Sequence, residues 1–296
     1  MLNIAATITI GPLLMFVSAF IFAVLDVLIK ILGPSFRVWD IAFYRFGFGL
    51  VMLTVVFGWR GNPFSGNNRK LLILRGISGS IAFVALVTAI RLIPVSTAMV
   101  FFYSFPAFAA FFSSLIFKEK ITLPEVCCIL VAFFGVTVLF DFSLQGLLLG
   151  QIMALLGGAA AGITVCMIKK LRETNGPVII YLYFCLIGTV ITLPSFIANP
   201  QIPATTDEFL IVGGIVFTSI SAQLIMNQGF KYCKSWEGGL FLTSELIFIS
   251  VFGIFLLGEL VNWHFWAGGI LIFGSVVALN YFNAQSATIS PNQKSL

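Results

Sequence analysis

The sequence has too few charged residues to build the surface of a soluble protein. Asp, Glu, Lys and Arg together make up 9% of its 296 residues, whereas hydrophobic residues make up 59%. Soluble domains contain about 25% charged residues on average. Most of the outer surface must therefore face lipid, and the chain is predicted to be an all-α protein embedded in a lipid bilayer.

Residues that hold metals and cofactors are also scarce. A single His excludes a His-rich metal site, and the five Cys have neither zinc nor disulfide spacing, so we interpret them as small core residues. The sequence contains no P-loop, G-x-S-x-G or H-E-x-x-H motif. We therefore predict no metal, no cofactor and no enzyme activity. The net charge of +5 does not indicate nucleic-acid binding, because the basic residues are scattered at the ends of apolar runs.

Apolar runs long enough to cross a bilayer recur along the whole chain. A helix crosses the hydrocarbon in about 20 residues, and polar breaks such as Gly61-Asn62-Pro63 separate the runs. Several breaks are very short, so consecutive helices must be antiparallel neighbours. The ten predicted spans are residues 12–32, 39–58, 71–90, 95–117, 122–140, 148–168, 177–197, 209–229, 237–257 and 263–283.

The distribution of Lys and Arg predicts the orientation of these spans. If the N-terminus is cytoplasmic, the cytoplasmic connections and tail hold 12 of the 16 basic residues, Arg75 among them. The outside connections hold Lys30, Arg37 and Arg91, and Arg45 lies within a span. Cytoplasmic loops of membrane proteins are enriched in Lys and Arg. Both termini are therefore predicted to be cytoplasmic.

The two halves of the chain share one register. A shift of 140 residues places Ser104 on Ser244 and Glu119 on Glu259, and the span boundaries coincide along the whole length. Each half has five spans, an odd number, so the second half must be inverted relative to the first. Inverted repeats are typical of secondary transporters. The predicted units are a first repeat at 1–140, a second, inverted repeat at 141–284 and a cytoplasmic tail at 285–296.

Ten spans in an inverted five-plus-five repeat resemble the drug/metabolite transporter superfamily, and specifically its EamA-type members. The stretch from Ala89 to Ala98 is similar to the family's link between its third and fourth helices. Pro106 and Glu245 each match half of a Glu-Pro pair that recurs in helices four and nine of the family. Arg45 matches an arginine that is often found in helix two. The resemblance covers about residues 10–283.

Two further features refine the resemblance. Glu119 and Glu259 match the glutamate that closes helices four and nine of the family. The region from Arg75 to Lys120 is most similar to members that are linked to uptake of S-adenosylmethionine and related metabolites. The resemblance therefore implies transport of a small organic metabolite.

Three ionisable residues lie well inside predicted spans, where a charge is costly and usually faces the bundle interior. Glu245 and Asp26 are candidates for substrate binding and for proton coupling, and Arg45 is a candidate ligand for a substrate carboxylate. Structural alternatives remain open for each residue. Glu245 can hold neighbouring helices together, and Asp26 can pair with Lys30 four residues along the same helix face. Arg45 can pair with Asp26 or Asp40, or extend outward to the membrane interface.

Uncharged polar residues inside the spans are further candidates for the substrate site. Tyr103 and Ser104 lie near the centre of the fourth span, and Gln223 and Asn227 lie in the eighth. By contrast, the small residues at 157–162 are interpreted as a close helix-packing face, because glycine and alanine allow helix backbones to approach each other.

These patterns predict a secondary transporter that moves a small organic metabolite, amino-acid-like or S-adenosylmethionine-like, across a bacterial inner membrane by alternating access. Its partners would be the small-molecule substrate and a proton or an exchanged metabolite, with no nucleic acid. Two alternatives stay open. One is a membrane-embedded lipid-handling enzyme or flippase, which would need clustered polar residues at one membrane interface. The other is a non-transporting channel or scaffold.

Overall fold

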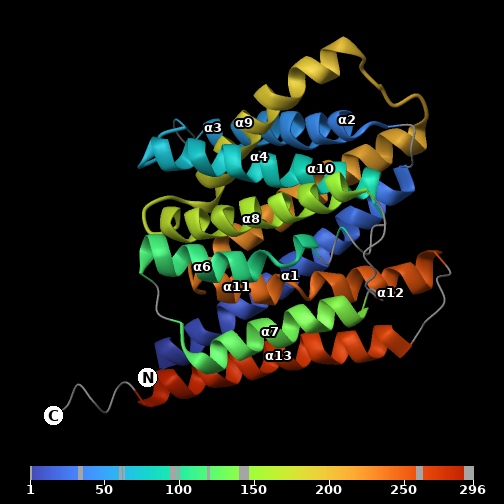
Figure 1. The fold of residues 1–296 in the computed structure, drawn as a ribbon. Coiled ribbons are helices and arrows are strands. Elements are labelled where there is room, and N and C mark those ends of the chain that lie inside the picture. Colours follow the sequence, from blue (N-terminus) through green and yellow to red (C-terminus); the bar gives the residue numbers. More distant parts are fainter. Residues whose placement is uncertain are drawn as a thin grey trace.

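The fold is built entirely of helices in the residues that the structure describes. The computed structural model describes residues 2–32, 36–59, 62, 64–93, 98, 101–118, 121–139, 147–257 and 263–289. The prediction of an all-α protein is confirmed (Figure 1). The helices are α1 (Leu2–Leu32), α2 (Val38–Phe43), η1 (Tyr44–Phe48), α3 (Gly49–Gly58), α4 (Arg69–Leu92), α6 (Phe105–Phe117), α7 (Leu123–Leu139), α8 (Leu148–Leu171), α9 (Pro177–Ala198), α10 (Thr206–Gly229), α11 (Ser235–Leu242), α12 (Glu245–Leu257) and α13 (Trp263–Ile289).

Several of these helices have the length and hydropathy of membrane spans. Among the described residues, six segments are long and apolar enough to cross a bilayer, and α2, η1 and α3 together form one of them. The protein is therefore a multi-pass membrane protein, while the count of ten spans and the inversion of the halves stay predictions. The six segments are Ile10–Ile29, Val38–Gly58, Arg69–Ala89, Leu148–Leu171, Pro177–Ala198 and Thr206–Gly229.

Two spans predicted as continuous helices are interrupted at matching positions. α6 begins only at Phe105, after a turn, and α11 and α12 are separated by a turn before Glu245. In the first turn the Ser104 hydroxyl donates to the carbonyl oxygen of Phe101 at 2.5 Å. In the second turn the Ser244 hydroxyl donates to the carbonyl oxygen of Phe241 at 2.7 Å. Each of these two predicted spans is therefore broken just before residue 105 or 245, a feature that hydropathy does not register.

The helices pack in pairs that join the two halves of the chain. α1 packs against α10, α4 against α8, and α7 against α13 (Figure 1). Small residues of α8 allow a close approach, as predicted. A Cβ atom added to Gly158 would lie 2.9 Å from the carbonyl oxygen of Phe102, and one added to Gly162 would lie 2.7 Å from Cβ of Phe108. Tight backbone contact therefore replaces hydrophobic burial as the packing force within lipid.

The first and last helices leave the bundle on the same side. Figure 1 shows the beginning of α1 and the end of α13 at one end of the molecule, which an even number of crossings requires. α13 continues to Ile289, so the helix includes the first five residues of the tail predicted at 285–296. The remainder of that tail, 290–296, lies outside the described residues, as do Glu119 and Glu259.

Candidate functional site

A cavity of about 190 Å³ lies inside the bundle, lined by residues of α1, η1, α4, α6, α8, α9, α10, α11 and α12 and of the turn before α6. It has room for on the order of ten water molecules. Most of its wall is aromatic or aliphatic. Its charged side chains are two carboxyl groups, Asp26 and Glu245, and two guanidinium groups, Arg45 and Arg75. An apolar cavity with a few convergent polar groups is the usual form of a small-molecule site.

The two carboxyl groups of the cavity meet across the helices that carry them. Asp26 comes from α1 and Glu245 is the first residue of α12, and their side chains are in hydrogen-bond contact. Glu245 is also in contact with the hydroxyl group of Tyr103. Two carboxyl groups can share a hydrogen bond only when one of them carries a proton, since an ionised carboxylate has no donor. The arrangement therefore allows the two acids to share a single proton.

Arg45 reaches the cavity from an irregular stretch of helix. It lies in η1, a π-helical segment within an otherwise α-helical span, and such segments often occur at functional sites. Its guanidinium group lies 4.8 Å from the centre of the Phe83 ring, and its Nη2 is 3.5 Å from Oε1 of Gln223, at the limit of a hydrogen bond. Its Nε is buried without a hydrogen-bond partner. Arg45 thus retains an unused donor at the wall of a largely apolar cavity.

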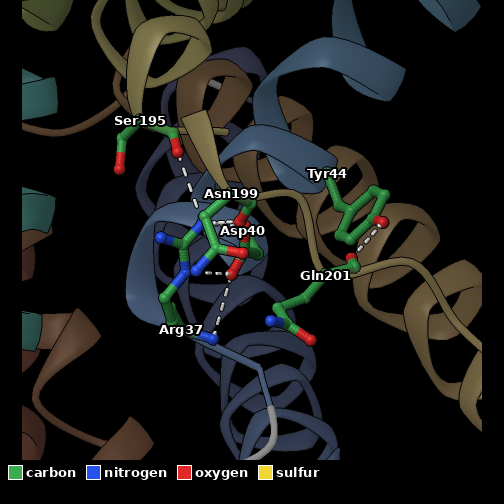
Figure 2. Close-up of polar contacts among 6 residues, drawn as sticks. All are labelled: Arg37, Asp40, Tyr44, Ser195, Asn199 and Gln201. Carbon is green, nitrogen blue, oxygen red and sulfur yellow. Dashed lines mark hydrogen bonds and ion pairs between the residues drawn. The ribbon is translucent and has the colours of Figure 1, made fainter. Parts of the chain in front are cut away.

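Asp40 does not pair with Arg45, which removes one of the alternatives that the sequence left open. Asp40 is buried and binds Arg37 instead, with both of its carboxylate oxygens 2.9 Å from guanidinium nitrogens (Figure 2). Arg37 also donates to the carbonyl oxygens of Ser195 and Asn199 at the end of α9. The network therefore ties α2 to α9 and leaves Arg45 to the cavity. The side chain of Lys30, the alternative partner of Asp26, lies outside the described residues.

The predicted site residues are only partly brought together. Asp26, Arg45, Tyr103, Gln223 and Glu245 all line the large cavity. The other two predicted residues, Ser104 and Asn227, are not among its lining residues. Ser104 borders a separate pocket of about 10 Å³. Asn227 is buried and donates through Nδ2 to the carbonyl oxygen of Pro177 at 3.2 Å, so it joins α10 to the start of α9.

Sequence reasoning missed Arg75 as a residue of the cavity. It was counted with the cytoplasmic connections, but α4 begins at Arg69 and carries Arg75 into the bundle. Arg75 is 1% exposed, lines the cavity and lies over the ring of Phe184 at 4.0 Å from the ring centre. A signal was present, because Arg75 lies inside the apolar run at 71–90 just as Arg45 lies inside another.

A bundle of membrane-spanning helices around a charged internal cavity is the architecture of a membrane transporter. The model of the EamA-like transporter family matches residues 9–141 and 148–281, so the chain belongs to this family. The resemblance noted from the sequence, to the drug/metabolite transporter superfamily, is thereby confirmed.

Several curated proteins are similar to most of the chain. The pseudopaline exporter CntI of Pseudomonas aeruginosa is 25% identical over 272 residues, which are 91% of this chain and 95% of the exporter. Solute carrier family 35 member G1 of Homo sapiens is 21% identical and covers 88% of this chain, with 76% of its own length aligned. The S-adenosylmethionine uptake transporter of Rickettsia bellii is 19% identical, covering 86% of this chain and 88% of itself.

A solved crystal structure has the same fold. It superimposes with a TM-score of 0.79 at 15% sequence identity, over 93% of this chain and 98% of the solved one. The fold is therefore shared at a level of sequence identity that carries no information about the substrate.

Proposed function

We propose that the protein is a secondary transporter that moves a small organic metabolite bearing both an ammonium and a carboxylate group across the bacterial inner membrane by alternating access. The observation that carries this proposal is that one cavity inside the bundle is lined both by a carboxyl pair and by guanidinium groups. A zwitterion of the amino-acid or S-adenosylmethionine type presents both complementary charges, and the aromatic wall suits its apolar part.

In this proposal each cavity residue has a distinct role. Arg45 binds the substrate carboxylate, since a planar guanidinium matches carboxylate geometry and Arg45 has spare donors. Asp26 and Glu245 alternate between holding the coupling proton and holding the substrate ammonium group. Tyr103 contacts Glu245 and keeps that carboxyl oriented, while Gln223 orients Arg45. Competition between proton and ammonium for one site links proton movement to substrate movement.

The helix packing supports alternating access. If the second half repeats the first, α8 corresponds to α1 and α10 to α4, so the pair of α1 with α10 and the pair of α4 with α8 are exchanged versions of each other. The turns before α6 and before α12 also correspond. Two similar halves can exchange conformations, which gives two states of comparable energy that open the cavity to opposite sides.

Transport by the purified protein tests this function. We would first screen amino acids, S-adenosylmethionine, nucleosides and polyamines for an increase in the melting temperature of the detergent-purified protein. Compounds that stabilise it would then be tested for exchange and for accumulation in proteoliposomes, with each direction measured separately because the relatives include an exporter and an uptake transporter.

The expected result is saturable exchange of a zwitterionic compound that Arg45→Gln abolishes and Arg69→Gln preserves. Arg69 is exposed at the start of α4 and therefore controls for the loss of one positive charge. Movement of labelled phospholipid between leaflets, without exchange of any soluble compound, would favour the flippase alternative. An unsaturable flux that is unaffected by Arg45→Gln would favour a channel.

A further inference from the structure

Arg75 has no partner that explains its burial. Its side chain is 1% exposed, and its Nε and Nη1 atoms are buried without a hydrogen-bond partner. The guanidinium group lies over the ring of Phe184, which contributes a cation–π contact but is not a hydrogen-bond partner. A buried cation that lacks a counter-charge and acceptors is expensive, so such groups are normally paired.

The acids of the cavity do not supply this pair. Asp26 and Glu245 contact each other, and Glu245 contacts Tyr103, whereas no ion pair with Arg75 occurs among the described residues. Arg45 lies near enough to Arg75 for the two positive charges to repel each other. With one proton held between the two acids, the cavity has a net positive charge. An anion would relieve both guanidinium groups.

The wall of the cavity holds the two guanidinium groups apart on aromatic rings. The ring of Phe46 contacts both supporting rings: its centre is 5.7 Å from that of Phe83, which lies under Arg45, and 4.9 Å from that of Phe184, which lies under Arg75. The two guanidinium groups therefore lie over different aromatic rings of the cavity lining, and a ring does not neutralise a cation.

We propose that Arg75 is a second anion-binding residue of the cavity, and that the substrate accordingly carries two acidic groups as well as an ammonium group. Arg45 binds one carboxylate, Arg75 binds the other, and the Asp26–Glu245 pair binds the ammonium group. This inference rests on the proposed function and names the class of substrate: an amino acid or amino-acid derivative with a second carboxylate. A substrate with one carboxylate would leave a buried guanidinium unpaired.

Two amino acids of nearly equal size distinguish a site for two carboxylates from a site for one. L-Glutamate and L-glutamine differ only in that a second carboxylate is replaced by a neutral amide. We would titrate each against the detergent-purified protein and measure binding by isothermal calorimetry. Loss of one charged hydrogen-bonded contact weakens binding by about tenfold or more, so L-glutamate should bind at least about tenfold more tightly than L-glutamine.

Three variants assign that preference to a residue. Arg75→Gln should remove the preference for L-glutamate, while Arg69→Gln, an exposed charge on the same helix, should retain it. Gly79→Ala perturbs Arg75 without removing its charge, because the added Cβ would lie 3.2 Å from Nη1 of Arg75 and 2.9 Å from the Phe184 ring. It should weaken L-glutamate binding more than L-glutamine binding, and it provides the test if Arg75→Gln does not fold.

Equal affinity for both amino acids, binding of neither, or an unchanged preference in Arg75→Gln or Gly79→Ala would overturn the inference. Its failure is distinguishable from failure of the proposed function, because binding is measured without transport. A protein that prefers L-glutamate through Arg75 but exchanges no labelled L-glutamate across vesicles would retain the second anion-binding residue and refute the transporter. A protein that exchanges zwitterions with one carboxylate, whether or not Arg75 is replaced, would support the transporter and refute the second anion-binding residue.

Discussion

Replacing Glu245 by glutamine should uncouple transport from the proton gradient. Glutamine keeps the size and hydrogen-bonding capacity of glutamate but cannot titrate. The carboxyl pair of Asp26 and Glu245 holds one proton between its two groups, and Tyr103 contacts the second of them. In Glu245→Gln the amide can still bond to Asp26 and to Tyr103, so the protein should fold, but the shared proton has lost its site.

The size of the effect follows from the number of protons that the pair can carry. A pH difference of one unit across the membrane corresponds to about 1.36 kcal/mol per proton moved, which is a factor of about ten in concentration. One proton per cycle therefore sets a limit of about tenfold accumulation of a zwitterion per pH unit when there is no membrane potential. Glu245→Gln should reduce this ratio to about one, while exchange between equal pools, which need not move a net proton, can survive.

The assay is accumulation of a labelled zwitterionic substrate in proteoliposomes with and without an imposed pH gradient. Glu173→Gln is the control, because Glu173 is an exposed carboxylate paired with Lys170 on the cytoplasmic side of the predicted topology. Unchanged accumulation in Glu245→Gln would refute the coupling role and make Asp26 the first candidate. Loss of both accumulation and exchange in a folded variant would indicate that Asp26 alone cannot hold the substrate ammonium group.

Three further predictions concern stability and topology. Burial lowers the pKa of Lys234, but its hydrogen bond to buried Glu125 at 2.9 Å and the charge of Glu237 outweigh this, so the pKa of Lys234 is raised. The pair therefore stabilises the fold at neutral pH and ceases to do so as pH rises through that raised pKa. Glu125→Gln should cost about 1 kcal/mol at pH 8, as measured by denaturant unfolding, and the difference should disappear well above pH 10.4. Gly162→Ala should destabilise by about 1–3 kcal/mol through overpacking, whereas Gly213→Ala, where an added Cβ meets nothing within 4 Å, should not; equal effects in thermal unfolding would contradict the close-packing explanation. In a background that lacks exposed Cys127, an impermeant thiol reagent added to intact cells should label a cysteine at Gln201 and not one at Asn67, and the opposite pattern would reverse the orientation.

The sequence alone determined that the protein is helical, membrane-embedded and a member of its family. These properties depend on composition and on local pattern, since a chain with 9% charged residues cannot be solvated by water. It also identified Glu245, Asp26 and Arg45 as candidate site residues. An ionisable group within an apolar run is costly in lipid, so it usually faces the bundle interior or has a function. Each of these inferences needs only a residue and its neighbours along the chain.

Only the tertiary structure decided which of these groups meet. Asp26 contacts Glu245, Asp40 forms an ion pair with Arg37, and Arg75 lines the cavity. All three arrangements depend on which helix faces are turned toward each other. Lipid tails are as apolar as the side chains they contact, so hydropathy does not encode that rotation. It is set by close contacts such as those of Gly158 and Gly162, and by the helix interruptions before Phe105 and Glu245. Helix faces in lipid are thus selected by fit between distant segments, which no local pattern in the sequence contains.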